Sequence, residues 1–419
     1  MSLEFARFQF QQAHRTLLLP SELLCRIFYF SLSTSPFGTI LRDRYGDITL
    51  SLKLSKMTTP FILGAVCRYW RYIAFQDPRL WNSIYLVANP LKAAIQAMLL
   101  REWLPRTGVL ALSIDVDCSN DDHKKWSSEY ADQSLLILRP IYEYSFRCTS
   151  FRTRLPPSCL LLPPDGLRIP DPCFDNLTTL EIAPFSLTEG VDDEDSEDLD
   201  IISVFQDSRQ LRHLTLWEIR NEQLELPWSS LALITISTKT LTLYDCLVLL
   251  RNAPNVEECE FMTVAYSSRF SLGKLPDTSI LLPRLYALSL DFTELGSSCD
   301  TIFRYIITPN LRKLRYLSQE GRDFPMEKFQ LFQDRSKCPL AHLEIKGPAM
   351  TTPDILACLK PYAQSLEYIV VEISFEDDDG IMSFQPTRLD TFFPRIRAAR
   401  FSAPLPVFRT LFPLFSSPK

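Results

Sequence analysis

Glycine and histidine are scarce in this sequence, and the motifs of several enzyme classes are absent. Only 11 of 419 residues are glycine, which disfavours phosphate-cradling loops, because these use glycine to bring the backbone close to a ligand. Neither H-E-x-x-H, G-x-S-x-G, G-x-G-x-x-G nor G-K-[ST] occurs. We therefore expect a non-catalytic protein without a cofactor, although distant residues can still assemble a catalytic site.

Metal ligands at the required spacing are also absent. The four histidines are His14, His123, His213 and His342, and none lies within four residues of a cysteine pair. There is no C-x-x-C, so we expect no structural zinc site. His213 and His342 each precede the second leucine of similar segments, which indicates a recurring structural position.

Charge and hydropathy exclude further classes. The chain has 44 basic and 50 acidic residues, a net charge of −6. It therefore lacks the positive electrostatic field that would attract nucleic acids and anionic membranes. No run of about 18 apolar residues is free of charge, so we expect no membrane span. The N-terminal residues do not resemble a secretory signal. With 11 scattered cysteines, this predicts the cytoplasm or nucleus, with free buried thiols.

Two acidic runs are predicted to be surface features. Residues 189–200 hold eight carboxylates in twelve positions, whose mutual repulsion predicts a solvated loop. A docking patch for a basic partner or a weak cation site is the alternative, but the EF-hand pattern fails. The run Glu376–Asp379 precedes Gly380 and predicts a turn between two extended segments.

The N-terminal region predicts short amphipathic helices. A helix starts at Pro20 or Ser21, with Glu22 at the positive end of its dipole, and its apolar face comprises Leu23, Leu24, Ile27, Phe28 and Leu32. Residues 33–60 lack a period and are predicted to be an insert. A second helical stretch, 61–75, ends at Asp77-Pro78 and places on one face Leu63, Val66, Cys67, Trp70 and Ile73. An extended run, 85–87, follows.

These residues match a known pattern in order and spacing. They are Leu19-Pro20, Glu22-Leu23-Leu24, Ile27-Phe28, Val66-Cys67-Arg68-Tyr69-Trp70-Arg71 and Pro78-Arg79-Leu80-Trp81. The segment 17–86 resembles an F-box. The gap between Phe28 and Val66 is longer than in the short F-box, and it is similar to the insert in the F-box-like group of mushroom-forming fungi. That insert affects the middle helix, which carries part of the family's partner surface.

The resemblance implies a Skp1-like adaptor, and through it a cullin, as partner. Three short helices cannot bury both faces of their apolar stripes, so a patch is left for another chain, formed by Leu19, Pro20, Leu23, Leu24, Ile27 and Val66. The alternative is that such residues form only the core of a helical cap. We expect Trp70, Ile73 and Trp81 to be core residues.

From residue 177 onward the pattern L-x-x-L-x-L returns nine times. It begins at Leu177, Leu211, Leu231, Val256, Leu285, Leu311, Leu340, Leu366 and Ile396. Successive starts lie 20 to 34 residues apart, with a mean of about 27, within the leucine-rich-repeat period. The L-x-L part places two apolar side chains on one face of a short strand. Amphipathic stretches at 301–307, 326–332 and 354–359 are predicted to be return helices.

The repeats are predicted to be irregular. The asparagine that follows the strand in regular leucine-rich repeats is missing, so we expect no asparagine ladder there. Residues 109–116 are predicted to be an earlier, degenerate strand, 133–146 a helix, and 155–172 a proline-rich loop. We therefore predict an α/β protein, with an F-box-like helical domain at 15–86 and an irregular leucine-rich-repeat solenoid, or horseshoe, at 87–419.

The implied function is substrate recognition in an SCF-type E3 ubiquitin ligase, with Skp1 on the F-box and an unidentified protein target on the concave strand face. The candidate target-binding residues are Trp217, Thr235, Glu260, Asp291, Glu344 and Glu372, accompanied by Thr215, Ser289, Lys346 and Val370. Several are acidic, which favours a basic target. The alternatives are a scaffold that no longer binds Skp1, an enzyme, and a small-molecule glue in the horseshoe.

Overall fold

The computed structural model describes residues 19–32, 41–42, 48–49, 60–118, 131–161, 172–183, 201–219, 221–238, 241–262, 279–292, 302–318, 323–372, 381–384 and 393–404. The chain divides into two compact units, Met1–Leu177 and Thr178–Lys419. The helical region before residue 86 and the parallel strands that directly follow it both lie in the first unit. Both acidic runs lie outside the described residues.

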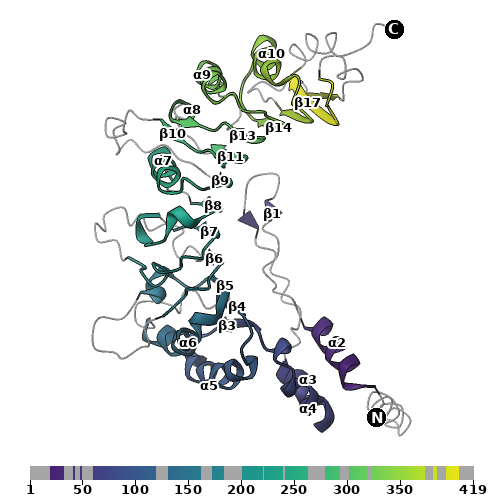
Figure 1. Ribbon diagram of the computed structural model, residues 1–419, viewed down its shortest axis with the longest axis vertical. Coiled ribbons are helices and arrows are strands. Elements are labelled where there is room, and N and C mark those ends of the chain that lie inside the picture. The colour runs from purple at the N-terminus through teal and green to yellow at the C-terminus, as the bar shows by residue number, and fades with distance from the viewer. Residues whose placement is uncertain are drawn as a thin grey trace. The chain divides into compact units, whose positions relative to one another are not determined.

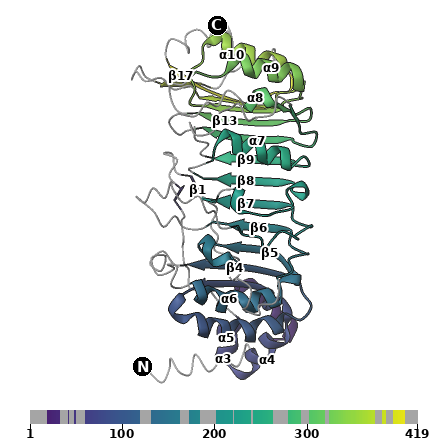
Figure 2. The same cartoon turned by 90° about the vertical axis from the view of Figure 1, so that its left-hand side faces the viewer.

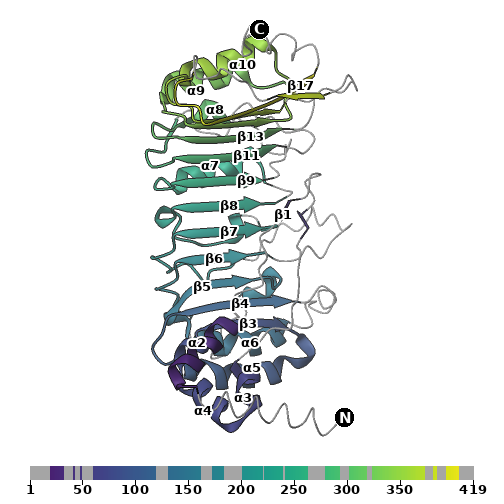
Figure 3. The same cartoon turned by 90° about the vertical axis from the view of Figure 1, so that its right-hand side faces the viewer.

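The first unit combines helices with parallel strands (Figure 3). The helices are α2 (Ser21–Ser31), α3 (Pro60–Val66), α4 (Arg68–Gln76), α5 (Ala93–Trp103) and α6 (Ala131–Glu143). The strands are β3 (Ser83–Ala88), β4 (Leu112–Cys118) and β5 (Cys148–Thr153). In the region of the predicted insert, β1 (Leu41–Arg42) pairs with β2 (Ile48–Thr49), and the rest of 33–59 lies outside the described residues. The predicted helices at 21–32 and 133–146 and the strands near 85 and 112 are confirmed.

The helix predicted over 61–75 is in fact two helices, broken at Cys67. Cys67 is extended (φ −159°, ψ 170°), and its thiol accepts a hydrogen bond from the Trp70 amide at 3.4 Å. It thus caps α4, which satisfies one of the amides that a helix start leaves without an intrahelical partner. Apolar spacing continued across the break, and so periodicity alone could not reveal it.

The core of the first unit is built around Trp81, which is completely buried. The Phe61, Phe75 and Trp103 rings lie 5.0, 5.2 and 5.5 Å from it in edge-on contacts, a favourable arrangement for aromatic quadrupoles. Its indole N–H donates to the Ala74 carbonyl at 2.7 Å. Ile73 and Trp81 are core residues as predicted, whereas Trp70 is only half-buried.

Charged residues are also buried between the strands of this unit. The Arg154 guanidinium lies 3.5 Å from the Asp117 carboxylate, and the Tyr85 hydroxyl donates to the same carboxylate at 3.0 Å. Burial, reinforced by the charge of Asp117, raises the pKa of Tyr85, so the hydroxyl stays a donor. The attraction between the two charges and the hydrogen bond from Tyr85 offset part of the cost of burying them.

The second unit is a large sheet with helices on one face (Figures 1 and 2). Its parallel strands are β6 (Thr179–Ile182), β7 (His213–Trp217), β8 (Leu233–Ser237), β9 (Glu258–Met262), β11 (Ala287–Phe292), β13 (Lys313–Ser318), β14 (His342–Lys346), β15 (Tyr368–Glu372) and β17 (Ala398–Pro404). At the edge, β16 (Ile381–Phe384) pairs antiparallel with β17. A separate pair joins β10 (Ile280–Leu281) to β12 (Ile306–Ile307).

All nine repeated segments form these parallel strands, and they pair in matching register. The second apolar position of each segment faces that of the next, as Leu180 faces Leu214 and Leu343 faces Ile369. At eight successive strand starts, two consecutive amides donate to one carbonyl of the preceding strand; Arg212 and His213 both donate to Thr178 at 3.0 Å. The sheet is thus built from one repeated step.

Side chains bridge the turns that precede the strands. The Asn176, Asn255 and Asn310 amides donate to the carbonyls of Phe146, Ser229 and Pro283, at 2.6, 2.9 and 2.8 Å. These asparagines precede the first apolar residue of their segments. The asparagine typical of regular leucine-rich repeats follows the strand, so the repeat pattern does not predict these links.

The helices of the second unit are α7 (Leu243–Asn252), α8 (Ile302–Tyr305), α9 (Met326–Ser336) and α10 (Thr352–Leu359). The last two confirm the predicted return helices. The helix predicted at 301–307 ends at Tyr305, because Ile306 and Ile307 pair with β10. Helix α7 was missed, although Thr242 and Asp245 form a reciprocal capping box whose T-x-x-D spacing is readable in sequence.

Candidate functional site

Helix α2 has a buried face and an exposed apolar face. Leu24 and Phe28 are buried, and the Phe28 ring lies 4.8 Å from that of Trp70. On a second face, Leu23, Ile27 and Phe30 are 46%, 48% and 78% exposed. At 100° per residue these three lie along one line of the helix. We call them the α2 stripe, an apolar surface that the described part of the chain leaves open.

The structure separates the six residues predicted to bind the adaptor. Pro20, Leu23, Ile27 and Val66 are exposed, Leu19 is half-buried, and Leu24 is 1% exposed. Leu24 therefore contributes to the core, and its side chain is out of reach of another protein. Phe30 and Ile62 were missed; both are exposed, and their helical spacing from Ile27 and Val66 places them on the same faces.

Asp77 lies near α2, in the segment that follows α4. It precedes the short helix η1 (Pro78–Leu80), and its carboxylate accepts from Nε and Nη2 of Arg79 at 2.9 and 2.7 Å. These hydrogen bonds hold the pKa of Asp77 below its usual value. Burial and the nearby Asp77 carboxylate raise the pKa of Cys25 on α2. Beside this contact lies a cavity of about 400 Å³, the α2 cavity, lined by Cys25, Arg26, Tyr29, Phe30, Arg79, Asn82 and Leu110.

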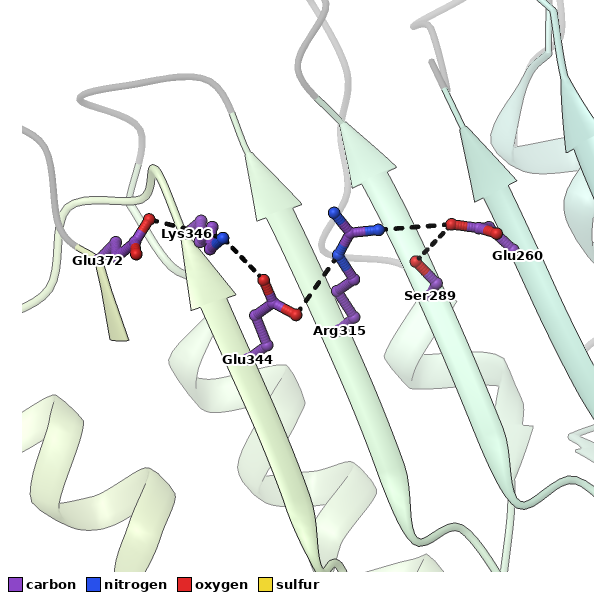
Figure 4. Close-up of polar contacts among 6 residues, drawn as sticks. All are labelled: Glu260, Ser289, Arg315, Glu344, Lys346 and Glu372. Carbon is purple, nitrogen blue, oxygen red and sulfur yellow. Dashed lines mark hydrogen bonds and ion pairs between the residues drawn. The ribbon is translucent and has the colours of Figure 1, made fainter. Parts of the chain in front are cut away.

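In the second unit, charged side chains line the sheet face opposite the helices (Figure 4). Arg315 lies between two carboxylates: its Nη1 is 3.4 Å from Glu260 and its Nε is 3.5 Å from Glu344. Ser289, on the intervening strand, donates a hydrogen bond to Glu260 at 3.4 Å. The small serine leaves room for Arg315 to reach across β11.

The row continues along the same face. Lys346 lies 2.9 Å from Glu344 and 3.6 Å from Glu372, and Arg400 lies 3.5 Å from Glu372. Burial opposes ionisation of Glu344, but Lys346 and Arg315 outweigh it and lower the pKa of this carboxyl. We call Glu260, Arg315, Glu344, Lys346, Glu372 and Arg400 the charge ladder.

The predicted target-binding residues have two different environments. Thr235, Glu260, Glu344 and Glu372 are half-buried and lie on the ladder face, whereas Trp217 and Asp291 are buried. Arg315 and Arg400 were missed, although they occupy the same middle position between two apolar residues of their repeats. With these two, the ladder holds three acidic and three basic side chains, so it is not the acidic surface that the sequence indicated.

Neither surface assembles chemical groups in a way that indicates catalysis. Within the described ranges, no three or more His, Cys, Asp or Glu side chains are grouped so as to hold a metal ion. None of the helices found there is long and apolar enough to cross a membrane. What the two surfaces offer is exposed apolar side chains in the first unit and paired charges in the second, both of which suit protein recognition.

Comparison with known protein families and with curated proteins finds no match to this chain.

Proposed function

We propose that this protein is a substrate-recognition subunit of an SCF-type ubiquitin ligase. The α2 stripe, with Val66 on α3, binds a Skp1-like adaptor, and the charge ladder of a leucine-rich-repeat solenoid binds the target. In this role the chain performs no chemistry. It holds a target near a ubiquitin-loaded enzyme and raises the effective concentration of the target's lysines.

One observation carries the proposal: α2 exposes an apolar line while its neighbours Leu24 and Phe28 are fully buried. A helix that only caps the sheet gains nothing from exposed Leu23, Ile27 and Phe30, because each costs hydration free energy in water. An adaptor that covers the stripe removes this cost. The repeating register of the nine strands supports the solenoid half of the proposal.

The test is co-expression with Skp1 followed by size-exclusion chromatography. Wild type is expected to form a one-to-one complex, and Leu23→Asp/Ile27→Asp is expected to weaken it at least about 100-fold, because two carboxylates would enter an apolar contact. The matched control, Ile95→Asp/Met98→Asp, changes exposed apolar residues of α5 in the same unit and should keep the complex. Circular dichroism confirms that each variant is folded.

A folded wild type without a complex would contradict the proposal, as would a stripe variant that binds normally. A second candidate function would then apply, a non-catalytic scaffold that recognises its partner through the charge ladder alone. The ladder favours this candidate because it lies in a different unit from the stripe.

A further inference from the structure

The α2 cavity and the α2 stripe lie on different flanks of α2 and meet at Phe30. Leu24 and Phe28 mark the core side of α2. With 100° of rotation per residue, Leu23 and Ile27 lie about 100° to one side of that direction, and Cys25 and Tyr29 lie about 100° to the other. Cys25 and Tyr29 thus place the cavity on the flank opposite Leu23 and Ile27, whereas Phe30 borders both the cavity and the stripe.

The walls of the cavity combine flat apolar surface with positive charge. Tyr29, Phe30 and Leu110 supply two rings and an aliphatic side chain, and Arg26 and Arg79 supply two guanidinium groups. Nε and Nη2 of Arg79 donate hydrogen bonds to the Asp77 carboxylate. The lining residues together with Asp77 carry one net positive charge, and Glu22 on α2 lies near enough to act electrostatically on Cys25.

One of the two guanidinium groups, that of Arg79, is already oriented. The hydrogen bonds to Asp77 fix the Arg79 guanidinium in one plane, which lowers the entropy cost of binding an anion. Among the described residues, Nη1 of Arg79 makes no hydrogen bond and Arg26 has no ion pair. The volume, about 400 Å³, falls within the range of roughly 300–1,000 Å³ that is usual for small-molecule sites.

We propose that the α2 cavity binds a small organic monoanion with a flat apolar body, of the aromatic carboxylate or sulfonate class. The body stacks on Tyr29 and Phe30, and the anionic group contacts Arg26 and the outer edge of Arg79. A neutral molecule of the same shape leaves the net positive charge without a partner. A dianion exceeds the single positive charge available.

Isothermal titration of the full chain with naphthalene-2-sulfonate tests the proposal, with 2-naphthalenemethanol as the neutral analogue. The sulfonate is expected to bind about ten-fold more tightly than the alcohol, because a hydrogen bond to a charged group contributes on this scale. Arg26→Gln should remove most of that difference and leave the affinity for the alcohol unchanged. Tyr29→Ser should weaken both ligands.

The control variant is Leu23→Ser/Ile27→Ser, which alters the stripe and not the cavity. It should bind the sulfonate as wild type does, and so failure of the adaptor experiment and failure of this one are distinguishable. Equal affinity for sulfonate and alcohol overturns the proposal. Undiminished sulfonate binding by Arg26→Gln, or its loss in the stripe variant, places the ligand elsewhere and overturns it as well.

Discussion

Replacing Trp81 by alanine should destabilise the first unit more than any surface change. The side chain is completely buried, and a tryptophan buries roughly 150–250 Å². At about 25 cal/mol per Å², the loss of this burial corresponds to about 4–6 kcal/mol. Large-to-alanine changes at buried aromatic sites cost about 3–5 kcal/mol, so the two estimates agree.

A second variant separates packing from hydrogen bonding. Trp81→Phe retains one ring among Phe61, Phe75 and Trp103 but removes the N–H that donates to the Ala74 carbonyl at 2.7 Å. That carbonyl then lacks its donor in a buried position, at a cost of about 1–3 kcal/mol. We therefore expect Trp81→Phe to lie between wild type and Trp81→Ala.

Hydrogen exchange measured by mass spectrometry on peptides from α4 and α5 is the appropriate assay. It reports the opening free energy of this unit alone, whereas unfolding of a two-unit chain need not be two-state. Tyr72→Ala, at an exposed position of α4, is the control and should change the opening free energy by less than about 0.5 kcal/mol. A Trp81→Ala protein within about 1 kcal/mol of wild type would refute the reasoning.

Two further predictions concern the second unit. Arg315→Met should lower the free energy of unfolding by no more than about 2 kcal/mol, because it removes two half-exposed ion pairs, which contribute about 0.2–1 kcal/mol each. Urea unfolding should show the difference shrinking in 1 M salt, where the Debye length is about 3 Å; a loss that salt leaves unchanged would contradict an electrostatic origin. Burial, together with Lys313, lowers the pKa of His342, so the folded state binds its proton less readily than the unfolded state. The free energy of unfolding should therefore fall as the pH drops below about 6.5. In His342→Gln, the urea concentration at the unfolding midpoint should change less between pH 7 and pH 5 than in wild type.

The strands were predictable from the sequence because each repeat carries the period-2 apolar pattern of a strand with one buried face. Two apolar residues at period 2, such as Leu343 and Ile345, can be buried together only by an extended segment with one face inward. The same logic found β4, where the repeat is degenerate. It could not show that the strands after residue 86 belong to the first unit, which depends on the pairing of β3 with β4.

The candidate sites were less predictable because they depend on which alternate residue is covered. Trp217 and Asp291 occupy positions that the pattern assigns to the exposed face, yet they are buried. Leu24 belongs to the segment Glu22-Leu23-Leu24 and was predicted to bind an adaptor, yet it is buried in the core. The sequence indicates the acidic residues of this face. That Arg315 balances the charges of Glu260 and Glu344 follows only from its distances to them.

The doubled amide step at each strand start has a consequence for how such a chain changes over evolutionary time. Each new strand is positioned by two of its own amides, which donate to one carbonyl beside the neighbouring strand. The Arg397 and Ala398 amides, for example, both donate to the Glu367 carbonyl. The connecting stretches take no part in that step, which is consistent with repeat starts 20 to 34 residues apart. Insertions and deletions between strands therefore leave the pairing register of the sheet unchanged. The connections can diverge in length and sequence while the register of the strands is retained.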